Sequence, residues 1–141
     1  MNEHSFIRSI HNYLDPKVYK WKIHDTFTGG VPDAMYCGPS GLLFVEYKYI
    51  KQLPKRNTTA IRTSLSAQQL AWLERISQPA IAALVIGCEN SCLLLVNQYN
   101  RKLYKTDFLN KKLTRKEIAA WISSTVLGED NDKQTTTPDS S

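Results

Sequence analysis

The stretch that most constrains the fold of this chain lies at residues 30–48. It contains two apolar runs, residues 34–36 and 42–45, separated by the turn sequence Gly-Pro-Ser-Gly. Short apolar runs on either side of glycine and proline are typical of two strands joined by a tight turn. This stretch therefore predicts a β-hairpin.

The register of the hairpin brings charged side chains together. A turn centred between Pro39 and Ser40 places Asp33 directly opposite Glu46, with the two Cβ atoms roughly 5 Å apart. Lys48 follows Glu46 by two residues, so the pleat directs both side chains to one face of the strand. The hairpin thus predicts two acids and one lysine that converge on one spot.

Two carboxylates on opposed strands repel one another and need a compensating cation. Oxygen ligands favour a hard divalent ion, so we expect Mg²⁺, for which Mn²⁺ can substitute. Lys48 is placed to orient or polarise a water molecule, or to stabilise charge on a phosphate. The alternative is structural: Glu46 and Lys48 would be solvated residues of an edge strand, and Pro32-Asp33 would begin a turn.

The same residues carry a family resemblance. Pro32-Asp33 followed by Glu46-Tyr47-Lys48 resembles the PD-(D/E)xK nuclease signature. Gly-Val-Pro-Asp, with Leu-Ser-Ala-Gln-Gln at residues 65–69, resembles its VRR-NUC branch, the virus-type replication-repair nucleases. The resemblance covers about residues 3–98 and implies a metal-dependent phosphodiesterase acting on DNA. It also implies an α/β fold with a restriction-endonuclease-like core, a mixed sheet flanked by helices.

The resemblance implies roles for single residues. Asp33 and Glu46 would hold one or two metal ions, with the backbone carbonyl of Tyr47 completing the set, and Lys48 would position or activate the attacking water. The resembling families often supply one more metal-binding glutamate from the first helix, where Glu3 is the only acid. Alternatively, Glu3 merely complements the helix dipole at the N-terminus.

A second helix is expected over residues 66–78, with Ser66 or Ser64 as its N-cap. Gln69 lies one turn before the apolar Leu73, so its side chain can reach inward beside the hairpin. In the resembling family the Ser-x-x-Gln of this helix lies near the active site, and here Ser66 and Gln69 match it. We expect Gln69 to hydrogen-bond a water molecule, a phosphate or a catalytic carboxylate.

The segment between the hairpin and this helix is basic. From Lys48 to Arg62 there are five cationic residues and no acid, mixed with Asn and Thr. Such a composition is typical of a loop that contacts phosphates, although a solvated loop with incidental charge is the alternative. The residues predicted to bind nucleic acid are Lys51, Lys55, Arg56, Arg62 and Ser66.

The rest of the chain predicts further elements, which complete the order αβββαββ plus a C-terminal helix. Residues 99–112, basic and aromatic, are either a second DNA-facing surface or a connection whose aromatic residues cover the core. The capping-box sequence Thr-Arg-Lys-Glu opens the last helix. The expected elements are a helix at 3–14, a half-exposed strand at 19–27, buried strands at 81–88 and 92–98, and a helix at 114–127.

Composition bounds the organisation of the chain and its surroundings. We expect one nuclease domain over residues 1–127 and a disordered acidic and polar tail over 128–141. The net charge is +5, and because the tail carries four acids against one lysine, the other 127 residues carry about +8. A basic body suggests a polyanionic partner.

Cysteine spacing and hydropathy indicate the compartment. The three cysteines lack CxxC spacing, which argues against a disulfide framework or a zinc site, and Cys88 and Cys92 are expected to be buried thiols. No run approaches the length of a membrane span, and the N-terminus lacks the apolar segment of a signal peptide. We therefore expect no membrane contact and a cytoplasmic protein, in the host cytoplasm if a phage encodes it.

These observations favour a Mg²⁺-dependent DNA endonuclease, which by resemblance would leave 5′-phosphate and 3′-hydroxyl ends. Small standalone members of the resembling group tend to be homodimers that cut both strands of branched DNA in repair and recombination. A homodimeric resolvase of four-way (Holliday) junctions is therefore the expected function. The alternatives are a nicking or flap nuclease with the same site, a catalytically inactive basic DNA-binding module, and RNA as the substrate.

Overall fold

A computed structural model describes residues 1–24 and 29–128. The acidic tail expected beyond the last helix, and the end of the expected first strand, lie outside the described residues, except for Gly128. In chain order the elements are α1 (Glu3–His11), β1 (Tyr19–Lys22), β2 (Ala34–Gly38), β3 (Gly41–Ile50), α2 (Ala67–Ile76), β4 (Ile81–Cys88), β5 (Ser91–Leu95), α3 (Lys105–Lys111), β6 (Leu113–Thr114) and α4 (Arg115–Leu127).

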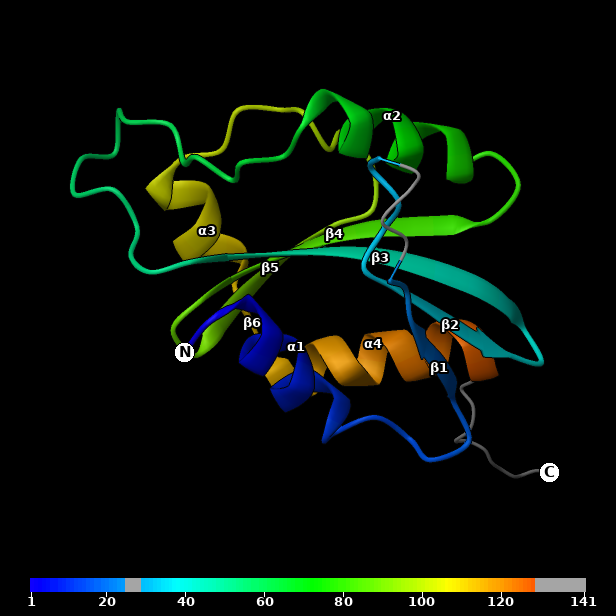
Figure 1. Cartoon of the computed structure of the whole chain (residues 1–141). Helices are drawn as coiled ribbons and strands as arrows, with labels where there is room; N and C mark the ends of the chain where they lie inside the picture. Colours follow the sequence, from blue (N-terminus) through cyan, green and yellow to red (C-terminus); the bar gives the residue numbers. More distant parts are fainter. Residues whose placement is uncertain (25–28, 129–141) are drawn as a thin grey trace, which may run out of the picture.

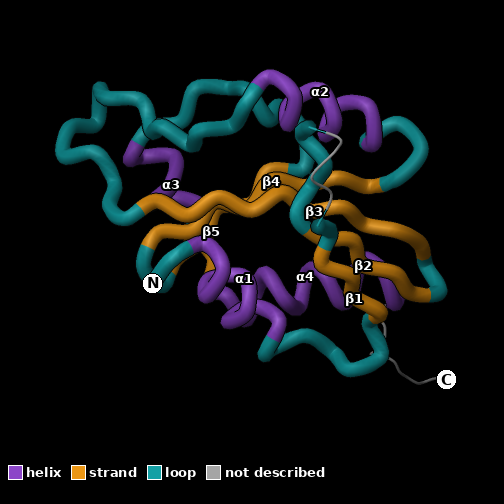
Figure 2. The backbone as a smooth tube through the Cα atoms, viewed as in Figure 1, coloured by secondary structure: helices purple, strands orange, loops and turns teal. Residues whose placement is uncertain are grey.

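The six strands form one mixed sheet in the order β1-β2-β3-β4-β5-β6. Within the described part of the chain, β3 and β4 are the parallel pair, and the other neighbouring strands pair antiparallel. A parallel pair requires a crossover, and the segment that contains α2 supplies it. Helices α2 and α3 lie on one face of the sheet and α1 and α4 on the other, which gives three layers (Figures 1 and 2).

The sheet separates two apolar cores. On the α1 and α4 face the fully buried residues include Phe6 and Ile122, and on the α2 and α3 face they include Leu73 and Phe108. Strand β4 contributes to both cores, which explains why its sequence is a continuous apolar run. Among the described residues, Glu46 is the one charged side chain that is buried, with 2% of its surface exposed.

The predicted hairpin register is confirmed. Ala34 pairs with Val45 and Gly38 pairs with Gly41, which is the register of a turn centred between Pro39 and Ser40. Gly41 has φ 141°, a conformation that residues with a Cβ atom rarely adopt. The turn chemistry and the alternation of the two strands therefore select the same pairing.

Helix α1 and strand β5 each end three residues before the end expected from the sequence. Helix α1 ends at His11, so Tyr13 lies beyond the helix and is 55% exposed instead of continuing the apolar stripe. Strand β5 begins at Ser91 and ends at Leu95, three residues before the expected end. Strand β1 is the sheet edge, and both of its aromatic residues are largely exposed, Tyr19 at 63% and Trp21 at 57%.

Residues 99–112 contain a short helix, α3, that was not expected from the sequence. Its N-terminus is stabilised by Asp107, whose carboxylate accepts a hydrogen bond from the Tyr104 backbone N–H at 2.8 Å. Of this segment's aromatic residues, Tyr99 and Phe108 are buried, at 5% and 1% exposed, so they cover the core of the α2 face. Helix α3 has seven residues, or about two turns, and so short a segment does not show a recognisable helical period of apolar residues in the sequence.

Two predictions from composition can be compared with the structure. Cys88 and Cys92 are buried free thiols, as expected, and Cys37 is partly buried. No helix in residues 1–24 and 29–128 is long and apolar enough to span a membrane.

Candidate active site

Glu46 and Lys48 lie on the face of β3 that α2 covers. Their neighbours on β4, Leu84 and Ile86, belong to the core of that face, so the parallel pairing directs the Glu46 side chain into a buried position. Lys48 remains accessible, with 13% of its side chain exposed, and its Nζ lies 3.5 Å from Glu46 Oε2. The acid is thus buried, and the lysine paired with it is partly accessible to solvent.

Gln69 joins this pair from the first turn of α2. Its Oε1 accepts a hydrogen bond from the Ser66 backbone N–H at 3.0 Å, while Ser66 Oγ accepts one from the Gln69 backbone N–H at 3.1 Å. This reciprocal capping box occupies the amide oxygen, so the amide nitrogen is the group left to point inward. Gln69 Nε2 donates a hydrogen bond to Glu46 Oε2 at 2.9 Å. The inward reach of Gln69 is confirmed, and its partner is the carboxylate.

Asp33 approaches the same strand from the start of the hairpin. Because β2 begins at Ala34, the backbone of Tyr47 on β3 lies beyond the end of the β2 ladder. Asp33 Oδ2 accepts the Tyr47 N–H at 2.8 Å in place of a strand partner. The N–H and C=O of one strand residue point to the same edge, so the Tyr47 carbonyl lies on the side of β3 where Asp33 sits.

Glu3, at the start of α1, is electrostatically coupled to this group. Burial and the Asp33 carboxylate raise the pKa of Glu3, whereas Lys48 and a hydrogen bond from the Tyr49 backbone lower it. Helix α1 lies close to the sheet because the Phe6 ring packs directly over Gly87 of β4, where a Cβ atom would clash. Glu3 therefore lies near the other charges although its residue is exposed overall.

The carboxyl groups of the site are short of positive charge. Burial raises the pKa of Glu46 to about 8, with further increases from Asp33 and Glu3 and an opposing effect from Lys48. The pKa of Asp33 is also raised, mainly by burial, against the lowering effects of the Tyr47 N–H and Lys48. Glu46 Oε1 is buried and has no hydrogen-bond partner among residues 1–24 and 29–128. Such an atom costs free energy unless another group engages it.

The donor set fits a hard divalent cation. In the described part of the chain, no three His, Cys, Asp or Glu side chains are grouped as ligands of a metal ion. Asp33 and Glu46, which lie close enough to raise the pKa of Glu46, would be the side-chain ligands, joined by the Tyr47 carbonyl in an all-oxygen set that suits Mg²⁺ or Mn²⁺. The partnerless Oε1 of Glu46 is the atom that such an ion would satisfy. Ligation by Glu3 stays a prediction.

The predicted nucleic-acid-binding residues lie on the loop between β3 and α2. Arg62 and the three cations before it are exposed. The loop is tied down at Ile61, which is buried and whose N–H donates to the Leu103 carbonyl at 2.7 Å. Ser66 is exposed at the end of the loop and serves as the N-cap of α2, so the structure selects it over Ser64. DNA contact by these residues stays a prediction.

Sequence reasoning missed a buried polar chain under the site. His11 Nε2 lies 2.7 Å from Tyr36 Oη, and Tyr36 Oη lies 2.6 Å from Tyr47 Oη. Burial lowers the pKa of His11 to about 4, so a neutral imidazole is hydrogen-bonded to Tyr36, whose hydroxyl is also hydrogen-bonded to Tyr47. The chain links α1, which carries Glu3, to β2, which begins directly after Asp33, and to β3, which carries Glu46. Strand alternation placed Tyr47 on the face opposite Glu46, but nothing local indicated its partner.

No protein-family model matches the chain, and no curated protein matches it. Among solved structures, the chain is similar to Archaeoglobus fulgidus Hjc, a Holliday junction resolvase from an archaeal hyperthermophile. The TM-score is 0.53 at 15% sequence identity, over 83% of this chain and 99% of that chain.

At this level of identity the likeness concerns the fold, so membership of the VRR-NUC branch stays a prediction. The six-stranded mixed sheet, the helices on both of its faces and the likeness to Hjc agree with one another. The chain has the restriction-endonuclease-like α/β fold expected from its sequence.

Proposed function

We propose that this protein is a Mg²⁺-dependent DNA endonuclease that hydrolyses phosphodiester bonds. The observation that carries the proposal is the state of Glu46, a buried carboxylate with one oxygen held by Gln69 and Lys48 and the other without a partner. A buried acid that is only partly compensated is costly for stability. Its position beside Asp33 indicates that the chain keeps it for chemistry.

Each residue of the site has a distinct task in this proposal. Asp33, Glu46 and the Tyr47 carbonyl would hold a metal ion, which when bound would supply Lewis acidity at the phosphate and lower the pKa of a water molecule. Lys48 orients the attacking water and stabilises the charge that develops on the phosphate. Gln69 fixes the direction in which the Glu46 carboxylate faces, as the outer partners of metal ligands do.

Branched DNA, and four-way junctions in particular, is the substrate that we propose. Support comes from the fold shared with Hjc, which is described as a Holliday junction resolvase, and from the basic loop beside the site. The described part of the chain offers one such site, so paired cuts in two strands need two copies of the chain. The proposal therefore includes a homodimer, and the VRR-NUC motifs of the sequence are consistent with it.

The experiment that tests this function compares a labelled four-way junction with a linear duplex and a single strand, each with Mg²⁺ and with EDTA. Cleavage is expected in Mg²⁺ and not in EDTA, and Glu46→Ala is expected to reduce the cleavage rate by at least about a hundredfold. Glu74→Ala, which removes an exposed acid of α2, is the matched control and should cut normally. Sedimentation of the protein with and without the junction measures the number of copies.

The outcomes separate the parts of the proposal. Symmetric paired cuts confined to the junction support a resolvase. Equal cutting of all three substrates retains the nuclease and removes the junction preference. Binding without cleavage under both Mg²⁺ and Mn²⁺ contradicts the enzyme and leaves a DNA-binding module.

A further inference from the structure

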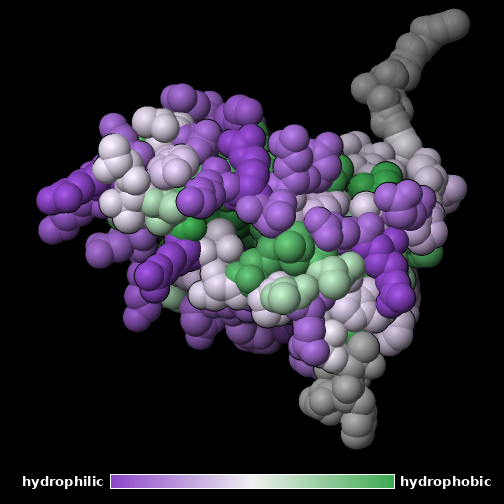
Figure 3. Space-filling view, turned by 90° about the horizontal axis from the view of Figure 1, so that it is seen from above, coloured by the Kyte–Doolittle hydropathy of each residue, from purple (hydrophilic) through white to green (hydrophobic). Residues whose placement is uncertain are grey.

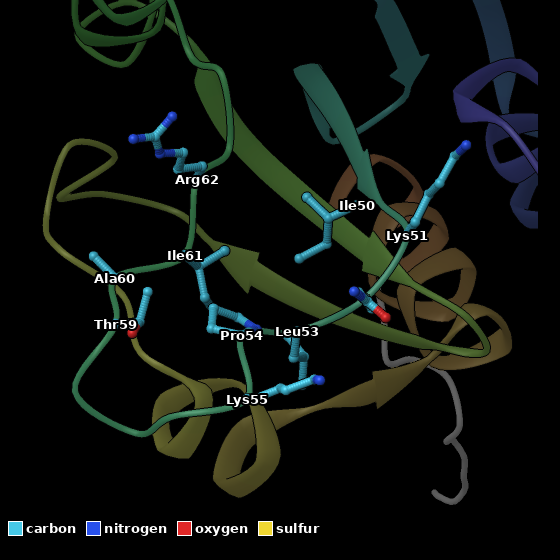
Figure 4. Close-up of a pocket in the computed structure, with 10 residues that line it drawn as sticks. Ile50, Lys51, Leu53, Pro54, Lys55, Thr59, Ala60, Ile61 and Arg62 are labelled. Carbon is cyan, nitrogen blue, oxygen red and sulfur yellow. The ribbon is translucent and has the colours of Figure 1, made fainter.

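A pocket of about 550 Å³ opens where β3 ends and the basic loop begins (Figure 4). Its apolar lining includes Ile50 and Ile61, whose side chains point toward one another across the pocket. Lys51, Lys55 and Arg62 lie around its edge. The pocket therefore combines an apolar interior with a cationic rim.

The interior of this pocket is held by the core beneath it. Ile61 is 8% exposed and is anchored by its backbone hydrogen bond to Leu103. Ile50 and Leu53 are partly buried and pack against the same core as Ile61. Figure 3 shows the α2 face of the molecule, on which apolar side chains are visible among a hydrophilic majority. The pocket is thus a preformed feature that stays open to solvent.

The pocket continues the proposed active site along β3. Ile50 lies two residues beyond Lys48 and four residues beyond Glu46, so all three side chains project from the same face of the strand. At about 3.3 Å per residue, the pocket begins about 13 Å from Glu46. A stacked DNA strand advances 3.4 Å per nucleotide, so this separation corresponds to about four nucleotides.

The chemistry of the pocket matches a nucleotide. A nucleobase has two apolar faces that gain from contact with Ile50, Leu53 and Ile61, while its flanking phosphates are anions that suit the cationic rim. The volume lies within the range of pockets that enclose small organic groups. A base that is stacked and paired in a duplex cannot enter, because its faces are already covered.

We propose that this pocket takes one unpaired nucleotide of the DNA strand that lies in the active site. The base rests against Ile50 and Ile61, and the phosphates on either side contact Lys51, Lys55 or Arg62. This inference rests on the proposed nuclease function and narrows its substrate. Extruding a base is cheapest when the base is already unpaired, so the preferred DNA has an unpaired base within about four nucleotides of the cut.

The direct test measures binding without chemistry. A fluorescent base analogue, 2-aminopurine, is placed at successive positions of a branched DNA and titrated with the wild-type protein in EDTA. We expect a change in fluorescence at one position within about four nucleotides of the cut when that base is unpaired, and none when it is paired. No response at any position would overturn the inference.

A variant that fills the pocket provides the second test. Ala60→Phe places a ring in the pocket, whereas Ala120→Phe adds the same ring to an exposed position on α4, on the other face of the sheet. Ala60→Phe is expected to weaken binding of the unpaired-base DNA by about tenfold and to leave paired duplex unchanged. An equal effect on both DNAs, or an equal effect of Ala120→Phe, would contradict the pocket. Thr59→Trp replaces Ala60→Phe if thermal melting shows that the latter is unfolded.

Two further arms separate this inference from its alternatives. A free deoxynucleoside monophosphate should not displace the DNA at equal concentration; displacement would assign the pocket to a free nucleotide and overturn the inference. If wild-type protein cuts DNA but Ala60→Phe retains its preference for unpaired bases, the result contradicts the role of the pocket and leaves the proposed nuclease function in place. If no DNA is cut under any condition, the nuclease fails, and the fluorescence titration still decides the pocket.

Discussion

Gln69 Nε2 donates a hydrogen bond of 2.9 Å to Glu46 Oε2, and this bond joins the first turn of α2 to the centre of β3. Both ends of the Gln69 amide are occupied, because its Oε1 closes the capping box with the Ser66 N–H. The side chain therefore has one orientation, and it presents a donor to the buried carboxylate. Helix capping and carboxylate orientation depend on the same residue.

Gln69→Ala tests this double role. Without the amide, Glu46 loses one of its two partners, and we expect cleavage of a DNA substrate to fall about 10–100-fold with a weaker apparent affinity for Mg²⁺. Loss of the cap should also lower the free energy of unfolding by about 1 kcal/mol. Gln78→Ala, at an exposed position after α2, should change neither quantity. Cleavage rates measured across a Mg²⁺ titration distinguish the two variants, and unchanged activity of Gln69→Ala would exclude an orienting role.

The raised pKa of Glu46 predicts a pH-dependent stability in the absence of divalent metal. The carboxyl group titrates near 4.5 in the unfolded chain and near 8 in the folded protein, so between these values the folded state binds the additional proton. The free energy of unfolding should therefore fall as pH rises from about 5 to 8. Thermal melting in EDTA across this range measures the effect.

Two controls identify Glu46 as the source of this slope. Glu46→Gln removes the titrating group and should flatten the dependence, leaving the smaller contributions of Asp33 and Glu3, whose pKa values are also raised. Mg²⁺ or Mn²⁺ should restore stability mainly at the alkaline end, where the carboxylate is charged and able to bind a cation. A melting temperature that rises with pH in EDTA for wild type, and not for Glu46→Gln, would contradict the burial of this acid.

The chain of hydroxyl groups under the site predicts an order of stabilities. Tyr36→Phe leaves both His11 and Tyr47 without their shared partner, whereas Tyr47→Phe leaves the Tyr36 to His11 bond in place. We expect each substitution to lower the free energy of unfolding by about 1–3 kcal/mol, with the larger decrease for Tyr36→Phe. A buried polar group that is left without a partner costs more than a hydrogen bond from which both partners have been removed. Urea denaturation measures both. Tyr19→Phe, on the exposed edge strand, is the control, and the reverse order would show that Tyr36 is not the bridge.

The basic loop predicts a characteristic salt dependence of DNA binding. Each of Lys55→Gln and Arg56→Gln should weaken binding to all DNA sequences and reduce the slope of log K against log salt by about 1, since each removes one phosphate contact. Lys17→Gln changes the net charge equally at an exposed position outside the loop, in the turn after α1. Fluorescence anisotropy at several salt concentrations provides the slopes. A loss of affinity that is the same for Lys17→Gln would indicate a general charge effect without local contact.

The local sequence determined the features of this protein that depend on short-range physics. Strand alternation and a Gly-Pro-Ser-Gly turn set the hairpin register, and with it the approach of Asp33 to Glu46. The helical period predicted that Gln69 reaches inward, because Gln69 lies four positions before the buried Leu73. The order of the predicted elements indicated an α/β fold around a mixed sheet, and the resemblance of the motifs to a nuclease family implied the restriction-endonuclease-like core.

Tertiary structure decided the features that depend on contacts between distant segments. The early end of β2 converts Asp33 into the acceptor of the Tyr47 N–H, the close fit of Phe6 on Gly87 brings α1 to the sheet, and His11 finds Tyr36 across the core. The burial that raises the pKa of Glu46 likewise comes from α2 packing over β3 and β4. Each of these features depends on desolvation and on packing between segments that are far apart in the chain. Such contacts leave no periodicity or motif spacing in the local sequence, so the sequence alone could not predict them.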